Sequence, residues 1–152
     1  MEPDRIEKSA EIAAPVARVW HALTDYRQFG EWFHVRLEGP FEAGEEARGQ
    51  VTWPSYEHLT FHAVVQEIEP EQYFAFTWHP YAVDPAVDYS RETPTLVEFR
   101  LEASADGVTR LTVSESGFRD LPDARRKEAW LRNEEGWGQQ MKKIAEYIRE
   151  NP

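Results

Sequence analysis

Hydrophobic residues near the start of the chain change their spacing at Pro15. Before it, apolar and polar residues alternate as in a strand. After it, apolar residues fall at i, i+3, i+4 and i+7, namely Val16, Val19, Trp20 and Leu23. Proline cannot donate to a sheet ladder, but its fixed φ and missing N–H suit the first position of a helix. The pattern predicts a strand that leads into a short amphipathic helix, followed by a turn or second short helix that Gly30 closes.

Between residues 35 and 118 the hydrophobic period is mostly two, and turn signals interrupt it repeatedly. This is typical of antiparallel strands with one apolar and one wet face. In the segment 108–116, Leu111 and Val113 face inward, and the same parity turns Glu115 inward. In 57–68 the parity breaks, which predicts a bulge in a long strand.

The last segment, 122–149, reads as one long helix. Its apolar stripe has a spacing of about 3.5 residues and consists of Trp130, Trp137, Met141, Ile144 and Ile148. The stripe needs an apolar surface to cover, and the inner sheet face is the nearest one. The sequence therefore predicts an α+β fold in which a curved antiparallel sheet grips a long C-terminal helix.

Composition narrows the class of protein. A chain of 152 residues with 41% hydrophobic residues suits one domain, 1–152. The net charge of −11 disfavours nucleic acid and anionic membranes as partners. The chain has no cysteine, and we find no signal peptide or apolar run long enough to span a bilayer, so we expect a soluble cytoplasmic protein.

Three features resemble the SRPBCC (START and Bet v 1-like) superfamily, in its polyketide cyclase-like and AHSA1-type branch. They are the run Ala-Pro-Val-Ala-Arg-Val-Trp-His-Ala-Leu-Thr-Asp at 14–25, the pair Trp32-Phe33, and Glu-Ser-Gly-Phe at 115–118 followed by Asn-Glu-Glu-Gly-Trp at 133–137. The resemblance implies a helix-grip fold, with about six or seven strands around the long helix and two short helices after the first strand.

The aromatic residues can form either a dense core or the walls of a partly hollow one. The stripe of the long helix has a polar gap at Asn133 and Glu134, and Glu115 faces the same interior. We therefore predict a ligand pocket with a few polar groups in apolar walls. Its candidate residues are Trp32, Phe33, Trp53, Phe61, Phe76, Trp78, Phe99, Glu115, Trp130, Asn133, Trp137 and Met141. The alternative places both carboxylates at element ends in water.

Two further features allow a structural and a functional interpretation. Gly136 and Gly138 lie inside the long helix, where each costs about 1 kcal/mol relative to alanine. We favour a close approach of the helix backbone to its neighbours over a kink at a pocket mouth. The segment 80–94 has three prolines and predicts a long loop, either a mobile connection or a lid.

Motifs for common enzymes, metals and cofactors are absent from the sequence. On a strand, His58 and His62 lie about 13 Å apart, too far for one ion. We expect no metal, no cofactor and no catalytic residue that the sequence can identify. If Glu115 is buried, its pKa rises, but it has no identified second group for acid–base chemistry.

Three functions remain open. The first is a binding module for an apolar or aromatic small molecule, with lipid, polyketide and flavonoid-like classes implied by the resemblance. The second, from the AHSA1-type branch, is a co-chaperone-like domain with a chaperone partner such as Hsp90. The third is an enzyme of the aromatase or cyclase type that uses Glu115 or a histidine. We favour the binding module. The fold alone does not fix the function, because it hosts transport, sensing and catalysis alike.

Overall fold

The computed structural model describes residues 4–84 and 86–152. The described elements follow the chain in this order: β1 (Arg5–Ile12), α1 (Val16–Thr24), α2 (Tyr26–Phe33), β2 (Val35–Leu37), β3 (Glu46–Val51), β4 (Thr60–Glu69), β5 (Tyr73–Trp78), β6 (Thr95–Ala105), β7 (Val108–Ser116) and α3 (Asp123–Glu150). Short 3-10 helices lie at Tyr89–Arg91 and Phe118–Asp120. The two short helices, the strands and the long C-terminal helix confirm the predicted α+β architecture.

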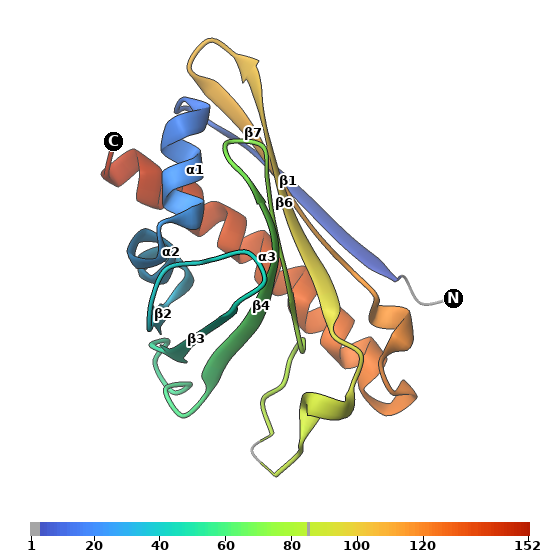
Figure 1. Cartoon of the computed structure of the whole chain (residues 1–152). Coiled ribbons are helices and arrows are strands. Elements are labelled where there is room, and N and C mark those ends of the chain that lie inside the picture. Colours follow the sequence, from blue (N-terminus) through green and yellow to red (C-terminus); the bar gives the residue numbers. More distant parts are fainter. Residues whose placement is uncertain (1–3, 85) are drawn as a thin grey trace.

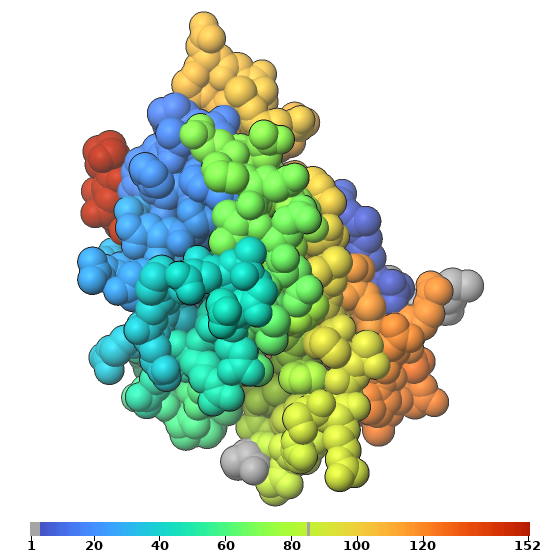
Figure 2. All heavy atoms as spheres, viewed as in Figure 1, coloured from blue at the N-terminus to red at the C-terminus, as the bar shows by residue number. Residues whose placement is uncertain are grey.

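The seven strands of the described residues form one antiparallel sheet in the order β1-β7-β6-β5-β4-β3-β2. Strands β2 to β7 are a meander, and β1 adds beside β7 at one edge. Figure 1 shows the sheet curving around α3, which crosses behind it, while α1 and α2 lie beside the C-terminal half of α3. In the space-filling view the turn between β6 and β7 projects from one end of the molecule (Figure 2). This is the helix-grip arrangement.

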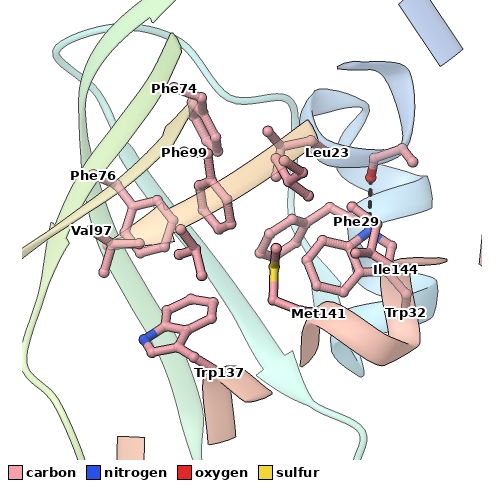
Figure 3. Close-up of a cluster of buried hydrophobic side chains, with 14 of the residues drawn as sticks. Leu23, Phe29, Trp32, Phe74, Phe76, Val97, Phe99, Trp137, Met141 and Ile144 are labelled. Atoms are coloured by element: carbon pink, nitrogen blue, oxygen red, sulfur yellow. Dashed lines mark hydrogen bonds between the residues drawn. The ribbon is translucent and has the colours of Figure 1, made fainter. Parts of the chain in front are cut away.

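The inner face of the sheet and the apolar face of α3 form the hydrophobic core. The buried residues of α3 are Ala129, Trp137, Met141, Ile144 and Ile148. In Figure 3, Trp137, Met141 and Ile144 of α3 face aromatic rings of the strands, among them Phe74, Phe76 and Phe99. Trp130 is only half-buried, with its indole directed at the carbonyl oxygen of Arg5 (3.3 Å), and Ala129 takes the inward position at this turn of the helix.

The start of the chain builds a rigid corner against this core. Pro15 lies one position before α1 with φ −69°, and its carbonyl oxygen accepts the first helical N–H groups. The Asp25 side chain caps α2 by accepting from the backbone N–H groups of Arg27 and Gln28. The indole N–H of Trp32 then donates to the Ala22 carbonyl oxygen at 2.8 Å, which ties α2 to α1 (Figure 3).

The parity break in the long strand is a bulge, as predicted. Phe61, Ala63 and Val65 face inward on β4, and the register to β5 shifts between Val65 and Glu67. The bulge lets the strand bend with the sheet. In the part of the chain that the structure describes, no helix has the length and apolar character required to cross a bilayer.

Candidate functional site

Glu115 lies on the inner face near the end of β7, with no exposed surface. Neighbouring strand ends meet there, because β5 ends at Trp78 and β6 begins at Thr95, directly opposite Trp78. The inward parity predicted for Glu115 is correct. The carboxylate therefore faces the core where the loop between β5 and β6 leaves the sheet.

Four donors bind the Glu115 carboxylate. Its Oε2 accepts from the indole N–H of Trp78 at 2.8 Å and the hydroxyl of Thr95 at 2.5 Å. Its Oε1 accepts from the side-chain amide of Asn133 at 2.9 Å and the indole N–H of Trp137 at 2.8 Å. One oxygen thus holds the ends of β5 and β6, and the other holds α3. The carboxylate joins the sheet to the helix.

Each carboxylate oxygen has one partner that can only donate and one that can adapt. The indoles of Trp78 and Trp137 can only donate, whereas the Thr95 hydroxyl can also accept a hydrogen bond. A protonated Oε2 can therefore donate to Thr95 while still accepting from Trp78, and Thr95 can turn its proton toward the Trp78 carbonyl oxygen, 3.5 Å away. The network is compatible with both charge states of Glu115.

Burial raises the pKa of Glu115 above 4.5, because removal from water penalises the charged form. The hydrogen bonds from Thr95, Trp137, Trp78 and Asn133 act in the opposite direction and offset part of this rise. Neutral donors alone surround the carboxylate. Proton uptake is thus easier here than for an exposed glutamate.

A pocket of about 180 Å³ lies directly beside these donors. Its walls are Phe33, Trp78, Asn133, Gly136, Trp137 and Gln140. The rings of Trp78 and Trp137 lie 5.7 Å apart between centroids, and each is 6.2 Å from Phe33. The pocket is therefore an aromatic slot whose indole walls Glu115 holds in place. We call it the inner lobe.

An outer lobe of about 290 Å³ shares Phe33, Gly136 and Gln140 with the inner one, so the two adjoin. It opens between α3 and the edge of the sheet formed by β2 and β3. Its remaining walls are His34, Val35, Val51, Trp53, Tyr56, Leu59, Gln139 and Lys143. Trp53 and Tyr56 are 39% and 48% exposed, which makes this lobe an accessible aromatic entrance.

The close packing predicted at Gly136 and Gly138 is wrong. A Cβ atom added at either glycine would meet no heavy atom within 4 Å. Gly136 instead lines both lobes, where the missing side chain leaves space between α3 and the aromatic walls. Gly136 is thus a pocket residue, and Gly138 is not among the lining residues of either lobe.

The loop between β5 and β6 is attached to α3 by Arg125. Its guanidinium donates to both carboxylate oxygens of Glu92, at 2.7 and 2.9 Å, and to the carbonyl oxygens of Pro80 and Tyr81, both at 2.9 Å. It also lies 4.7 Å from the ring centroid of Tyr89. Both ends of the predicted loop are therefore anchored next to the Glu115 site, while residue 85 within it lies outside the described residues.

The structure brings five of the candidate site residues together at the inner lobe and the carboxylate. They are Phe33, Trp78, Glu115, Asn133 and Trp137. Others fill the core behind it, namely Trp32, Phe61, Phe76, Phe99 and Met141, all at most 5% exposed. Trp53 lines the outer lobe, and Trp130 lies apart near β1. Glu134 pairs with Lys8 at 2.5 Å rather than facing the pocket.

Sequence reasoning missed Thr95, Gln140 and Lys143. Thr95 could have been found, because Val97, Phe99 and Leu101 alternate inward on β6, and one more step of that parity reaches it. Gln140 follows Trp137 by one helical turn. Lys143 follows Gln140 by the same step, so helical spacing places all three on one side of α3.

Two other concavities have a different character. The larger, about 1050 Å³, lies on the outer sheet face and is lined mainly by charged side chains such as Arg5, Glu67 and Arg100. The other, about 650 Å³, lies where β1, α1 and the end of α3 meet, and Ile12 and Ile148 contribute to it. In the described ranges, three or more His, Asp or Glu side chains do not gather anywhere as a metal site would require.

Residues 13–149 match the family model described as "Activator of Hsp90 ATPase homolog 1-like protein". No curated protein matches this sequence. The match spans nearly the whole chain and includes both lobes and the Glu115 site.

Solved structures share the fold. MLL2253 from Mesorhizobium loti is 24% identical with a TM-score of 0.77, and the match covers 97% of this chain and 98% of that one. CalU16 from Micromonospora echinospora is 19% identical with a TM-score of 0.65, covering 95% and 75%. DynU16, a protein of the dynemicin biosynthetic locus, is 25% identical with a TM-score of 0.74, and 97% of this chain spans about half (48%) of its length.

Replacing Glu115 by glutamine tests the four-donor arrangement. The glutamine NH₂ must face either Trp78 or Trp137, whose indoles cannot accept. We expect Glu115→Gln to lower the free energy of unfolding by about 1–3 kcal/mol, measured by urea denaturation. Glu102→Gln, at an exposed position of β6, is the control and should change it by less than about 0.5 kcal/mol. An unchanged Glu115→Gln stability would contradict the assigned hydrogen bonds.

The raised pKa of Glu115 predicts a pH dependence. The folded state keeps this proton at pH values where the unfolded chain, with a pKa near 4.5, has released it. The stabilisation is fully present below that pH and is lost as the pH rises through the folded-state pKa. The stability advantage of the wild type over Glu115→Gln should therefore shrink as pH rises from about 4.5, in urea unfolding at several pH values. An advantage that grows with pH would contradict the raised pKa.

Proposed function

The chain belongs to the family of activator of Hsp90 ATPase homolog 1-like proteins, within the SRPBCC superfamily that its sequence resembles, and we propose that it is a small-molecule binding module. The site is the two-lobed pocket between the sheet and α3. The ligand is apolar or aromatic, of the lipid, polyketide or flavonoid-like classes.

One observation carries the proposal. An open space lined by Phe33, Trp78 and Trp137 lies against the long helix, and Gly136 keeps it open at a cost in helix stability of about 1 kcal/mol. The rings offer flat apolar surfaces at distances typical of aromatic packing. Apolar walls with a few convergent polar groups are typical of small-molecule sites.

The size and rigidity of the site support a compact ligand. The inner lobe, about 180 Å³, suits one or two rings, and the outer lobe gives room for a substituent. Because Glu115 fixes both indoles and Asn133, the inner walls are set before binding. Such pre-organisation lowers the entropy lost on binding.

The enzymatic alternative has less support. A catalytic acid or base must reach the substrate, directly or through one water. Glu115 is fully buried, and each of its oxygens already accepts two hydrogen bonds. Its role in this arrangement is to position the pocket walls.

Filling the inner lobe from α3 tests the proposal. The probe is phenylnaphthylamine, an uncharged aromatic dye whose fluorescence rises in apolar surroundings. We expect the wild type to bind it and Gly136→Met to weaken binding about tenfold or more, because the new side chain occupies the pocket.

Gly138→Met is the matched control, since the same change two residues away lies outside both lobes. Its dissociation constant should stay within about twofold of the wild type. Urea unfolding of both variants checks that they fold. No binding by the wild type, or equal weakening by both variants, would contradict the proposed site.

A further inference from the structure

The outer lobe contains a cation that lacks an anionic partner. Lys143 is a half-buried residue whose ammonium lies 3.4 Å from the ring centroid of Trp53. Across residues 4–84 and 86–152, no carboxylate oxygen lies within ion-pair distance of it. Burial lowers the pKa of Lys143, and the charge of Glu146 offsets this only partly.

Lys143 defines the electrostatics of this lobe. No Asp, Glu or Arg is among the residues that line it. His34 packs edge-on against Trp53 at 4.4 Å between centroids, and burial together with Lys143 lowers its pKa, which favours the neutral imidazole. The lobe thus presents one ammonium over an exposed indole. An anionic group placed there would gain a partly desolvated ion pair without displacing an existing one.

A second unsatisfied polar group lies where the two lobes meet. The side-chain oxygen Oε1 of Gln140 is buried and has no hydrogen-bond partner, and Gln140 lines both lobes. A buried acceptor without a partner is unfavourable. Because this oxygen is itself buried, a rotation of the Gln140 side chain would bring it to a hydroxyl or N–H group on a ligand that spans the lobes.

The charge of the whole chain works against anions. With a net charge of −11, the protein repels a negatively charged ligand at long range. A preference for an anionic ligand must therefore arise locally, from Lys143.

We propose that the ligand is an amphipathic aromatic acid. Its rings occupy the inner lobe between Phe33, Trp78 and Trp137, a hydroxyl or N–H group donates to Gln140, and its anionic group pairs with Lys143 beside Trp53. This inference rests on the proposed binding function and adds the charge and orientation of the ligand.

Two probes that share one skeleton separate the inference from the proposed function. Anilinonaphthalene sulfonate is an aromatic anion with a bridging N–H, and phenylnaphthylamine is the same skeleton without the sulfonate. We expect the wild type to bind the sulfonate about tenfold more tightly than the uncharged probe. Lys143→Met should abolish this preference, so that the two probes bind the variant with dissociation constants within about twofold of each other.

Lys142→Met is the control, because it removes the same charge from the adjacent exposed residue outside the lobe. It should keep the preference, and Lys143→Arg should retain most of it. If phenylnaphthylamine fails to bind the wild type, the proposed function fails. If it binds but the wild type shows no preference for the sulfonate, or Lys142→Met and Lys143→Met reduce the preference equally, the inference about the anionic group is overturned.

Discussion

The carboxylate of Glu115 is completely removed from water, and it is stable there because neutral donors from three elements surround it. Trp78 ends β5, Thr95 begins β6, and Asn133 and Trp137 lie one turn apart on α3. An unpaired buried carboxylate would cost several kcal/mol, so each donor is required to hold its position. The ends of the strands, the long helix and the anchored loop all meet at this residue.

This constraint decides where the molecule is filled and where it is open. Behind Glu115 the ring of Phe99 packs against those of Phe76 and Trp137, and all three residues are buried. Beside it, the indoles are turned by their hydrogen bonds to the carboxylate, and Gly136 contributes no side chain opposite them. The open space therefore lies at the edge of the core, and we propose that the ligand binds there.

The sequence predicts the fold in detail because its signals are local and periodic. Alternation along β6 and β7 sets which side chains face inward, and the stripe on the last helix requires a surface to cover. It does not predict which donors reach Glu115, because that depends on the register of three strands and on the position of α3. The sequence likewise does not reveal that Trp53 and Trp130 lie outside the core. Both are large aromatic residues, and only the three-dimensional packing distinguishes them from the buried ones. The role of Gly136 could not be predicted from the sequence either. A glycine inside a helix looks the same in the sequence whether it allows a close contact or leaves a pocket open.

The indole N–H resonances of the six tryptophans test most directly whether the ligand binds beside the residues that Glu115 holds. They can be followed by nitrogen–proton correlation NMR during titration with phenylnaphthylamine. The account predicts that the signals of Trp78 and Trp137 shift to saturation, while those of Trp20 and Trp32, which lie in or near the corner formed by α1 and α2, stay in place. Saturation that moves Trp20 or Trp32 and leaves Trp78 and Trp137 unchanged would contradict it.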